Sequence, residues 1–110
     1  MPQGLRILVV DNVTDTEEVL RAVLEPRGML VNRRTRHHPA SHVQARPTVV
    51  VLDEEATTPQ TELEFCNVPQ VIIGRTELPA AVDRRVLAKP FHYAELVQAI
   101  EQLVAHRRAI

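Results

Sequence analysis

The hydrophobic residues of the chain form short continuous runs, each about as long as a β-strand. These runs predict five strands, at residues 6–10, 29–35, 48–53, 70–73 and 86–88. Runs that are apolar at nearly every position are typical of strands buried on both faces, as in a parallel sheet covered by helices. A cluster of arginines at the end of the second run and just after it is interpreted as a solvated sheet edge: Arg33, Arg34 and Arg36.

Segments with helical spacing separate the predicted strands. Thr14 and Glu17 form a capping box that opens the first helix, and Gly28 is its expected end. Residues 92–106 have the strongest helical pattern, with one apolar face. The other candidates are weak and short: residues 39–45, 61–66 and 78–85.

Strands that alternate with helices predict an α/β fold. Five such units suit a doubly wound, five-stranded parallel sheet with the flavodoxin-like order 2-1-3-4-5. The chain of 110 residues has the length of one domain and contains neither an internal repeat nor a linker. We therefore interpret residues 1–110 as a single domain, which could also be the regulatory part of a longer protein.

Composition excludes several classes of function. With 13 Lys and Arg against 14 Asp and Glu, the chain lacks the positive charge of a nucleic-acid binder. Its apolar runs are too short to span a bilayer, and the N-terminus has no signal-peptide pattern. The lone Cys66 cannot form an internal disulfide, and we expect it to fill space in the core. A cytoplasmic protein without membrane contact is the resulting expectation.

Polar residues follow the predicted strands at their carboxyl ends. Asp11 and Asn12 follow the first strand, Asp53 ends the third, and Gly74 and Lys89 follow the next two. In a doubly wound sheet these ends border the crevice where ligands bind. Because Lys89 is the only lysine among 13 basic residues, its position there needs an explanation. We expect these residues to share one pocket.

Such a pocket has a definite chemistry. Neighbouring carboxylates repel each other, and a divalent cation such as Mg2+, which prefers oxygen ligands, relieves that repulsion. A lysine ammonium can hold a carboxylate or a phosphoryl oxygen. An aspartate beside both groups is a candidate nucleophile toward phosphorus, giving an acyl phosphate.

Three segments of the sequence carry a resemblance to a known family. Residues 7–12 (ILVVDN), 49–53 (VVVLD) and 87–91 (LAKPF) resemble the signature blocks of two-component response-regulator receiver domains. The order and spacing of the blocks fit over essentially the whole chain. The resemblance implies a CheY-like domain in phosphorelay signalling, with a histidine kinase or phosphotransfer protein as donor. It also implies an output domain or partner protein that receives the signal.

The resemblance assigns a role to each residue of the expected pocket. Asp53 matches the phosphoacceptor, and Asp11 matches one acidic ligand of the metal, expected to be Mg2+. Lys89 matches the lysine that contacts the phosphate, and a cis peptide bond is expected before Pro90. The backbone carbonyl of Glu55 falls where the family supplies a further metal ligand. Phosphorylation and dephosphorylation of its own aspartate would be the only catalysis by such a domain.

The chain departs from the family in ways that predict an impaired switch. Asn12 replaces a second acid, so we expect it to ligate the metal more weakly. Gly74 replaces the switch serine or threonine, and Val86 replaces the switch aromatic. The intervals 53–71 and 74–89 are shorter than the family norm by roughly one to two helical turns, so the third and fourth helices should be shortened.

Three functions remain open at this point. The first is an atypical receiver that is phosphorylated on Asp53. The second is a phosphorylation-independent pseudo-receiver that acts as a protein-interaction module, with a homodimer as one form. The third, an unrelated flavodoxin-like enzyme or nucleotide binder, is disfavoured because the sequence has no glycine-rich phosphate loop.

Three histidines without a neighbouring cysteine or acidic ligand are interpreted as solvated: His37, His38 and His42.

Overall fold

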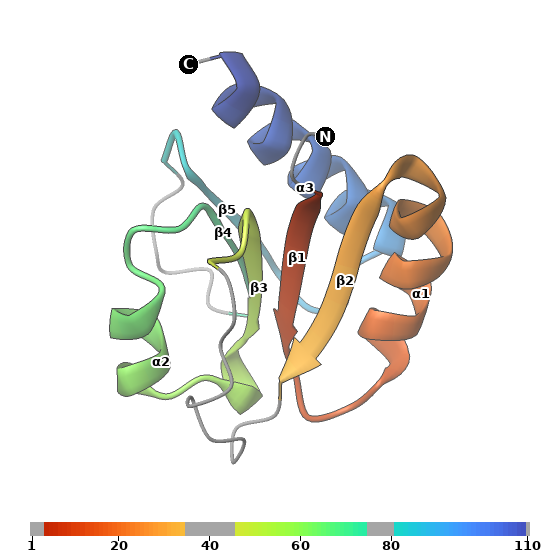
Figure 1. Cartoon of the computed structure of the whole chain (residues 1–110). Helices are drawn as coiled ribbons and strands as arrows, with labels where there is room; N and C mark the ends of the chain where they lie inside the picture. The colour runs from red at the N-terminus through yellow and green to blue at the C-terminus, as the bar shows by residue number, and fades with distance from the viewer. Residues whose placement is uncertain (1–3, 35–45, 75–80, 110) are drawn as a thin grey trace.

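Helices follow the first, third and fifth strands in the part of the chain that the structure describes. The computed structural model describes residues 4–34, 46–74 and 81–109 (Figure 1). Its strands are β1 (Leu5–Val10), β2 (Met29–Arg34), β3 (Val49–Asp53), β4 (Gln70–Ile73) and β5 (Arg84–Leu87). Its α-helices are α1 (Asp15–Leu24), α2 (Pro59–Glu64) and α3 (Tyr93–Ala109), with short 3-10 turns η1 (Glu25–Arg27) and η3 (Glu54–Ala56).

All five strands form one parallel sheet in the order β2-β1-β3-β4-β5. The predicted strand order 2-1-3-4-5 is therefore confirmed. The carboxyl ends of β1, β2 and β3 lie together at the lower edge of the molecule in Figure 1. This edge is the place where the doubly wound topology puts a ligand crevice.

The sheet has a hydrophobic core on each face. Alternate strand residues, such as Val9 and Val51, pack on one face against Leu20 of α1 and Ile100 of α3. Their neighbours, such as Val10 and Leu52, pack on the other face with Phe65, which follows α2. Burial of apolar side chains on both faces is the physical reason for the continuous apolar runs in the sequence.

The helix between β3 and β4 is short, and the described residues just before β5 are not helical. The helix that follows β3, predicted to be shortened, is α2, and it has only six residues, so this prediction is confirmed. A predicted helix at 78–85 is wrong over its second half, because Ala81 forms an isolated antiparallel bridge with Arg84 and β5 begins there. Residues 78–80 and the predicted helix at 39–45 lie outside the described residues.

The arginines lie on an edge strand as predicted, since β2 is the outermost strand of the sheet, but Arg33 and Arg34 are paired with carboxylates and not simply solvated. Both terminal nitrogens of Arg34 bond the carboxylate of Glu64, at 2.9 and 2.8 Å, and the guanidinium lies 4.9 Å from the ring centre of Phe65. Arg33 pairs with Glu17 at 3.3 Å. Each arginine found a carboxylate from another element, which sequence spacing could not indicate. Arg36, like the three histidines, lies outside the described residues.

Two local expectations also need correction. Thr14 precedes α1 without a side-chain capping bond, and Glu17 instead pairs with Arg21 and Arg33, so the capping box is wrong. Cys66 is exposed and fills no core space. Gly28 does end the segment of α1 and η1, with a left-handed φ of 91°. No helix in the described residues is long and apolar enough to cross a membrane.

Candidate functional site

Asp53 ends the buried strand β3 at the carboxyl edge of the sheet. Its side chain is 12% exposed, and its Oδ1 accepts a hydrogen bond from the backbone N–H of Glu55 at 2.9 Å. The Thr57 hydroxyl donates to the Asp53 carbonyl at 2.7 Å, which fixes the turn after the strand. The largely buried carboxylate is therefore oriented by its own backbone turn.

Asp11 lies beside Asp53 because β1 and β3 are paired. Val10 is in register with Leu52, so the next residues of the two strands, Asp11 and Asp53, occupy equivalent positions. Asp11 is 6% exposed, and its Oδ1 accepts from the N–H of Val13 at 3.1 Å. The guanidinium of Arg33 donates to the Asp11 carbonyl at 3.0 Å. Sequence reasoning missed this contact because it joins two strands.

Lys89 completes the group. Its Nζ lies 3.1 Å from both carboxylate oxygens of Asp53 and 3.6 Å from Oε2 of Glu55. Partial burial lowers the pKa of Lys89, but the hydrogen bond to Asp53 and the nearby carboxylates of Asp53, Glu55 and Glu54 outweigh it. The pKa is raised overall, so the ammonium is charged at neutral pH. The peptide bond between Lys89 and Pro90 is cis, as expected.

Asn12 and Glu55 contact each other at the rim of the site. The Asn12 side-chain amide donates to the Glu55 backbone carbonyl at 3.4 Å. The resemblance assigned both groups to the metal, and here they bond each other. An aspartate at position 12 has no N–H and could not donate this bond. In this chain the Asn12 amide therefore occupies the Glu55 carbonyl, which a bound cation would otherwise contact.

The oxygen atoms of this site are suitable ligands for Mg2+, but fewer of them are negatively charged than in a site that binds the ion tightly. Asp11, Asp53, the Glu55 carbonyl and the Asn12 amide oxygen are all hard oxygen donors, the class that Mg2+ prefers. Only two of these four donors carry a negative charge. In the described part of the chain, no cluster of three or more His, Cys, Asp and Glu side chains has a metal-holding arrangement. The donor set therefore fits a weak site.

The resemblance assigns switch residues to Gly74 and Val86, near the ends of β4 and β5. Gly74 follows β4 with a φ of 103°, in the left-handed region, and its N–H donates to the Leu87 carbonyl at 2.8 Å. Val86 lies in β5, in register with Ile72, and is half-buried. Neither side chain offers a hydroxyl group to a phosphoryl oxygen.

Glu54 is a further residue of the site that sequence reasoning missed. A Cβ placed on Gly74 would lie 2.6 Å from its Cδ and Oε1. The signal in the sequence was an acid directly after Asp53 combined with a glycine at the end of the next strand. Each half of that signal is common, and only the sheet brings them together.

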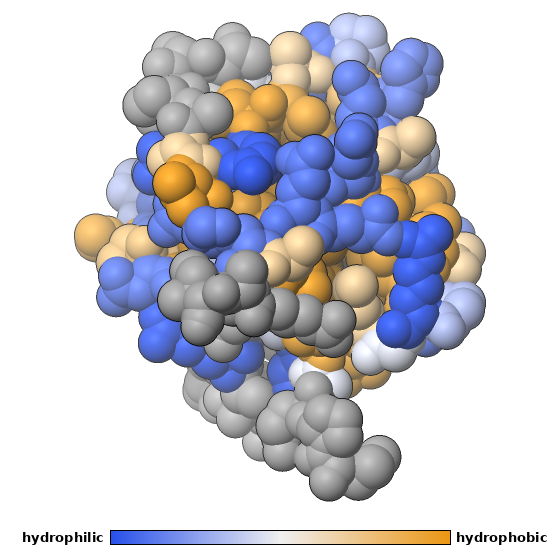
Figure 2. Space-filling view, turned by 90° about the horizontal axis from the view of Figure 1, so that it is seen from above, coloured by the Kyte–Doolittle hydropathy of each residue, from blue (hydrophilic) through white to orange (hydrophobic). Residues whose placement is uncertain are grey.

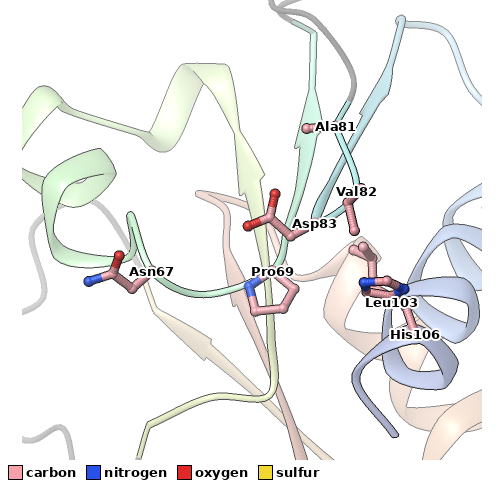
Figure 3. A pocket seen from close by; sticks show the side chains of 7 residues that line it. All are labelled: Asn67, Pro69, Ala81, Val82, Asp83, Leu103 and His106. Carbon is pink, nitrogen blue, oxygen red and sulfur yellow. The ribbon is translucent and has the colours of Figure 1, made fainter. Parts of the chain in front are cut away.

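A separate pocket of about 520 Å3 lies at the opposite end of the sheet. Val82 and Asp83 line one side of it, and Leu103 and His106 of α3 line another (Figure 3). Figure 2 shows the molecule from above, where apolar residues are scattered among hydrophilic ones. Because the pocket is at the amino ends of β4 and β5, it is not part of the acidic site.

Comparison with known proteins finds similarity in structure only. No protein-family model and no curated protein match the sequence. A receiver protein from Sinorhizobium medicae superposes with a TM-score of 0.66 and 24% identity, covering 96% of this chain and 98% of its own. For a CheY-like receiver domain from Methanospirillum hungatei the values are 0.71, 17%, 98% and 100%.

A third similar structure comes from a larger protein. It is the N-terminal domain of a three-domain response regulator/sensory box/GGDEF protein from Carboxydothermus hydrogenoformans. The TM-score is 0.68 at 19% identity, and the match covers 94% of this chain and 97% of that domain. In all three cases the match covers nearly the whole of both chains. This chain therefore has the fold of a response-regulator receiver domain.

Proposed function

We propose that this chain is a receiver domain in a phosphorelay, which accepts a phosphoryl group on Asp53 and has an impaired switch. One observation carries the proposal: the Lys89 ammonium lies 3.1 Å from both oxygens of the Asp53 carboxylate, at a strand end beside Asp11. A carboxylate next to a charged amine at the edge of a parallel sheet is equipped to attack phosphorus.

The reaction is a single transfer. A carboxylate oxygen of Asp53 forms a bond to phosphorus, while the bond from phosphorus to the donor's nitrogen or oxygen breaks and the donor keeps that electron pair. Lys89 moves from the carboxylate toward the phosphoryl oxygens and offsets their charge. Asp11, Asp53, the Glu55 carbonyl and Asn12 would hold Mg2+, which supplies further positive charge when bound.

The donor and the recipient of the signal are inferred by analogy with receiver domains. A histidine kinase or phosphotransfer protein in the cytoplasm presents phosphorus on an imidazole nitrogen. The M. hungatei neighbour is a CheY-like receiver, and the C. hydrogenoformans neighbour belongs to a three-domain protein. By analogy, this domain acts on an output domain or on a separate partner protein.

A second function is favoured by Gly74 and Asn12. Gly74 has no hydroxyl to bond a phosphoryl group, and Asn12 carries no charge for a metal. A pseudo-receiver that binds its partner, or a second copy of itself, without phosphorylation would tolerate both. It predicts that partner binding is the same in wild type and in the variant Asp53→Asn.

Incubation with acetyl phosphate and Mg2+ tests the first function. Intact-mass measurement should find one added phosphoryl group on the wild type and none on Asp53→Asn. Asp83→Asn is the matched control, since Asp83 is exposed and lies at the opposite end of the sheet. A wild type that stays unmodified, with either acetyl phosphate or a phosphorylated histidine donor, would contradict the proposal.

A further inference from the structure

The side chain of Glu54 lies over Gly74. A Cβ on residue 74 would be 2.6 Å from Cδ and Oε1 of Glu54 and 2.8 Å from its Cγ, distances well inside van der Waals contact. The carboxyl group of Glu54 thus occupies the space that a side chain at position 74 would need. This occupancy requires a glycine, which the positive φ of Gly74 also favours.

This space adjoins the candidate phosphoacceptor. Asp53 is in register with Ile73, so Gly74 follows the direct neighbour of Asp53 in the sheet. The Gly74 N–H bonds the carbonyl of Leu87, two positions before Lys89. The Glu54 carboxylate is one of three that act on the Lys89 ammonium, with those of Asp53 and Glu55.

We propose that the Glu54 carboxylate competes with an incoming phosphoryl group at Asp53, for space over Gly74 and for the charge of Lys89. The inference rests on the proposed function and adds a residue that controls its rate. A phosphoryl group brings negative charge to a place beside the Glu54 carboxylate, and like charges repel at short range. Phosphorylation is fast only when the Glu54 side chain turns away.

Glu54 takes no part in bond making. With acetyl phosphate as donor, an Asp53 oxygen bonds to phosphorus, the bond from phosphorus to the acetate oxygen breaks, and acetate leaves with the electron pair. The part of Glu54 is to raise the barrier of this transfer by its charge. Its side chain is exposed, so it can rotate outward without unfolding the domain.

The deciding variant is Glu54→Gln, which keeps the shape of the side chain and removes its charge. We expect its initial rate of phosphorylation by acetyl phosphate to rise about tenfold, equivalent to one modest charge repulsion. Glu25→Gln is the matched control: it removes one exposed carboxylate in η1, which follows the far end of α1 from Asp11. It should react at the wild-type rate, and Asp53→Asn should not react.

Two further measurements separate this inference from the proposed function. Beryllofluoride, a phosphoryl mimic, should bind Glu54→Gln more tightly than wild type, as judged by amide shifts near residue 53, while thermal unfolding stays unchanged. If the wild type is phosphorylated and the variant Glu54→Gln reacts at the same rate or more slowly, the inference is wrong and the proposed function still stands. If neither protein is phosphorylated, the proposed function is wrong, and the inferred competition at Asp53 is wrong as well.

Discussion

Arg34 holds Glu64 by two parallel hydrogen bonds, of 2.9 and 2.8 Å, and thereby fastens α2 to the outer strand β2. The arginine side chain is 9% exposed and the glutamate side chain 30%. Paired charge-assisted bonds of this geometry are among the stronger polar contacts in proteins. α2 is only six residues long, and this ion pair, the ring of Phe65 and the buried hydrogen bond from the Gln70 side chain to the Phe65 carbonyl help to anchor it.

The pair predicts a loss of stability in acid. Its hydrogen bond from Arg34 lowers the pKa of Glu64 below 4.5, against a smaller opposing effect of burial. A carboxyl group with a lowered folded-state pKa contributes stability above its unfolded pKa and loses it as pH falls through the folded value. The free energy of unfolding by urea should therefore decrease below about pH 4.5, the unfolded pKa.

Glu64→Gln identifies the part of this change that belongs to the pair. We expect the variant to be less stable than wild type by about 1–2 kcal/mol at pH 7 and nearly equal to it at low pH. Glu25→Gln, which removes an exposed carboxylate, should follow the wild-type curve. A Glu64→Gln curve parallel to wild type at all pH values would mean that the ion pair adds nothing.

Removal of the amine should affect chemistry more than folding. Lys89→Ala deprives the phosphoryl group of its nearest cation, and the loss of one such charge at a reacting centre costs about 100-fold in rate. Its side chain is 35% exposed, so the midpoint of thermal unfolding should move little. Rates with acetyl phosphate and melting curves check both points; Arg6→Ala, on the opposite end of β1, controls for loss of a positive charge.

Restoring an acid at position 12 should strengthen Mg2+ binding. Asn12→Asp adds a negative oxygen ligand and removes the amide bond to the Glu55 carbonyl, so that carbonyl becomes available to the ion. We expect the affinity for Mg2+ to rise about tenfold or more at constant ionic strength, measured by calorimetry. Asn32→Asp, an exposed site in the middle of β2, adds the same charge elsewhere. Equal gains in both variants would argue against a site at Asn12.

A side chain at position 74 should change the rate at Asp53 as well as stability. Gly28 and Gly74 both have positive φ, so each substitution by alanine should cost about 1–2 kcal/mol of backbone strain. Only at Gly74 does the new Cβ displace Glu54, because nothing lies within 4 Å of the Cβ position at Gly28. Gly74→Ala should therefore change the rate of phosphorylation, because the Cβ moves Glu54 and itself fills part of the space over position 74, and Gly28→Ala should leave the rate unchanged.

The sequence predicted the sheet well because its signals were local. An apolar run such as 49–52, followed by Asp53, marks both a buried strand and its end. The chain order of such strands, with the rule for doubly wound sheets, was then enough to bring Asp11, Asp53 and Lys89 to one edge. These are the parts of the site that the backbone alone positions.

The rest could not be predicted because it depends on side chains from distant elements. Glu17 looked like a capping residue, but one of its carboxylate oxygens pairs with Arg33 from β2 and the other with Arg21 of its own helix. Arg34 looked solvated, and its partner Glu64 is 30 positions away. The contact of Glu54 with Gly74 likewise has no local pattern. Pairings of this kind are visible only after the chain is folded.

The neighbouring residues Arg33 and Arg34 have a mechanical consequence. Successive side chains of a strand point to opposite faces, so Arg33 reaches the Asp11 carbonyl and α1, while Arg34 reaches α2. A single peptide unit thus joins the acidic edge to the short helix on the other side of the sheet. A displacement of α2 would therefore pull on the strand whose Arg33 bonds the Asp11 carbonyl. In this way β2 connects the helix on one face of the sheet to the acidic edge and α1 on the other.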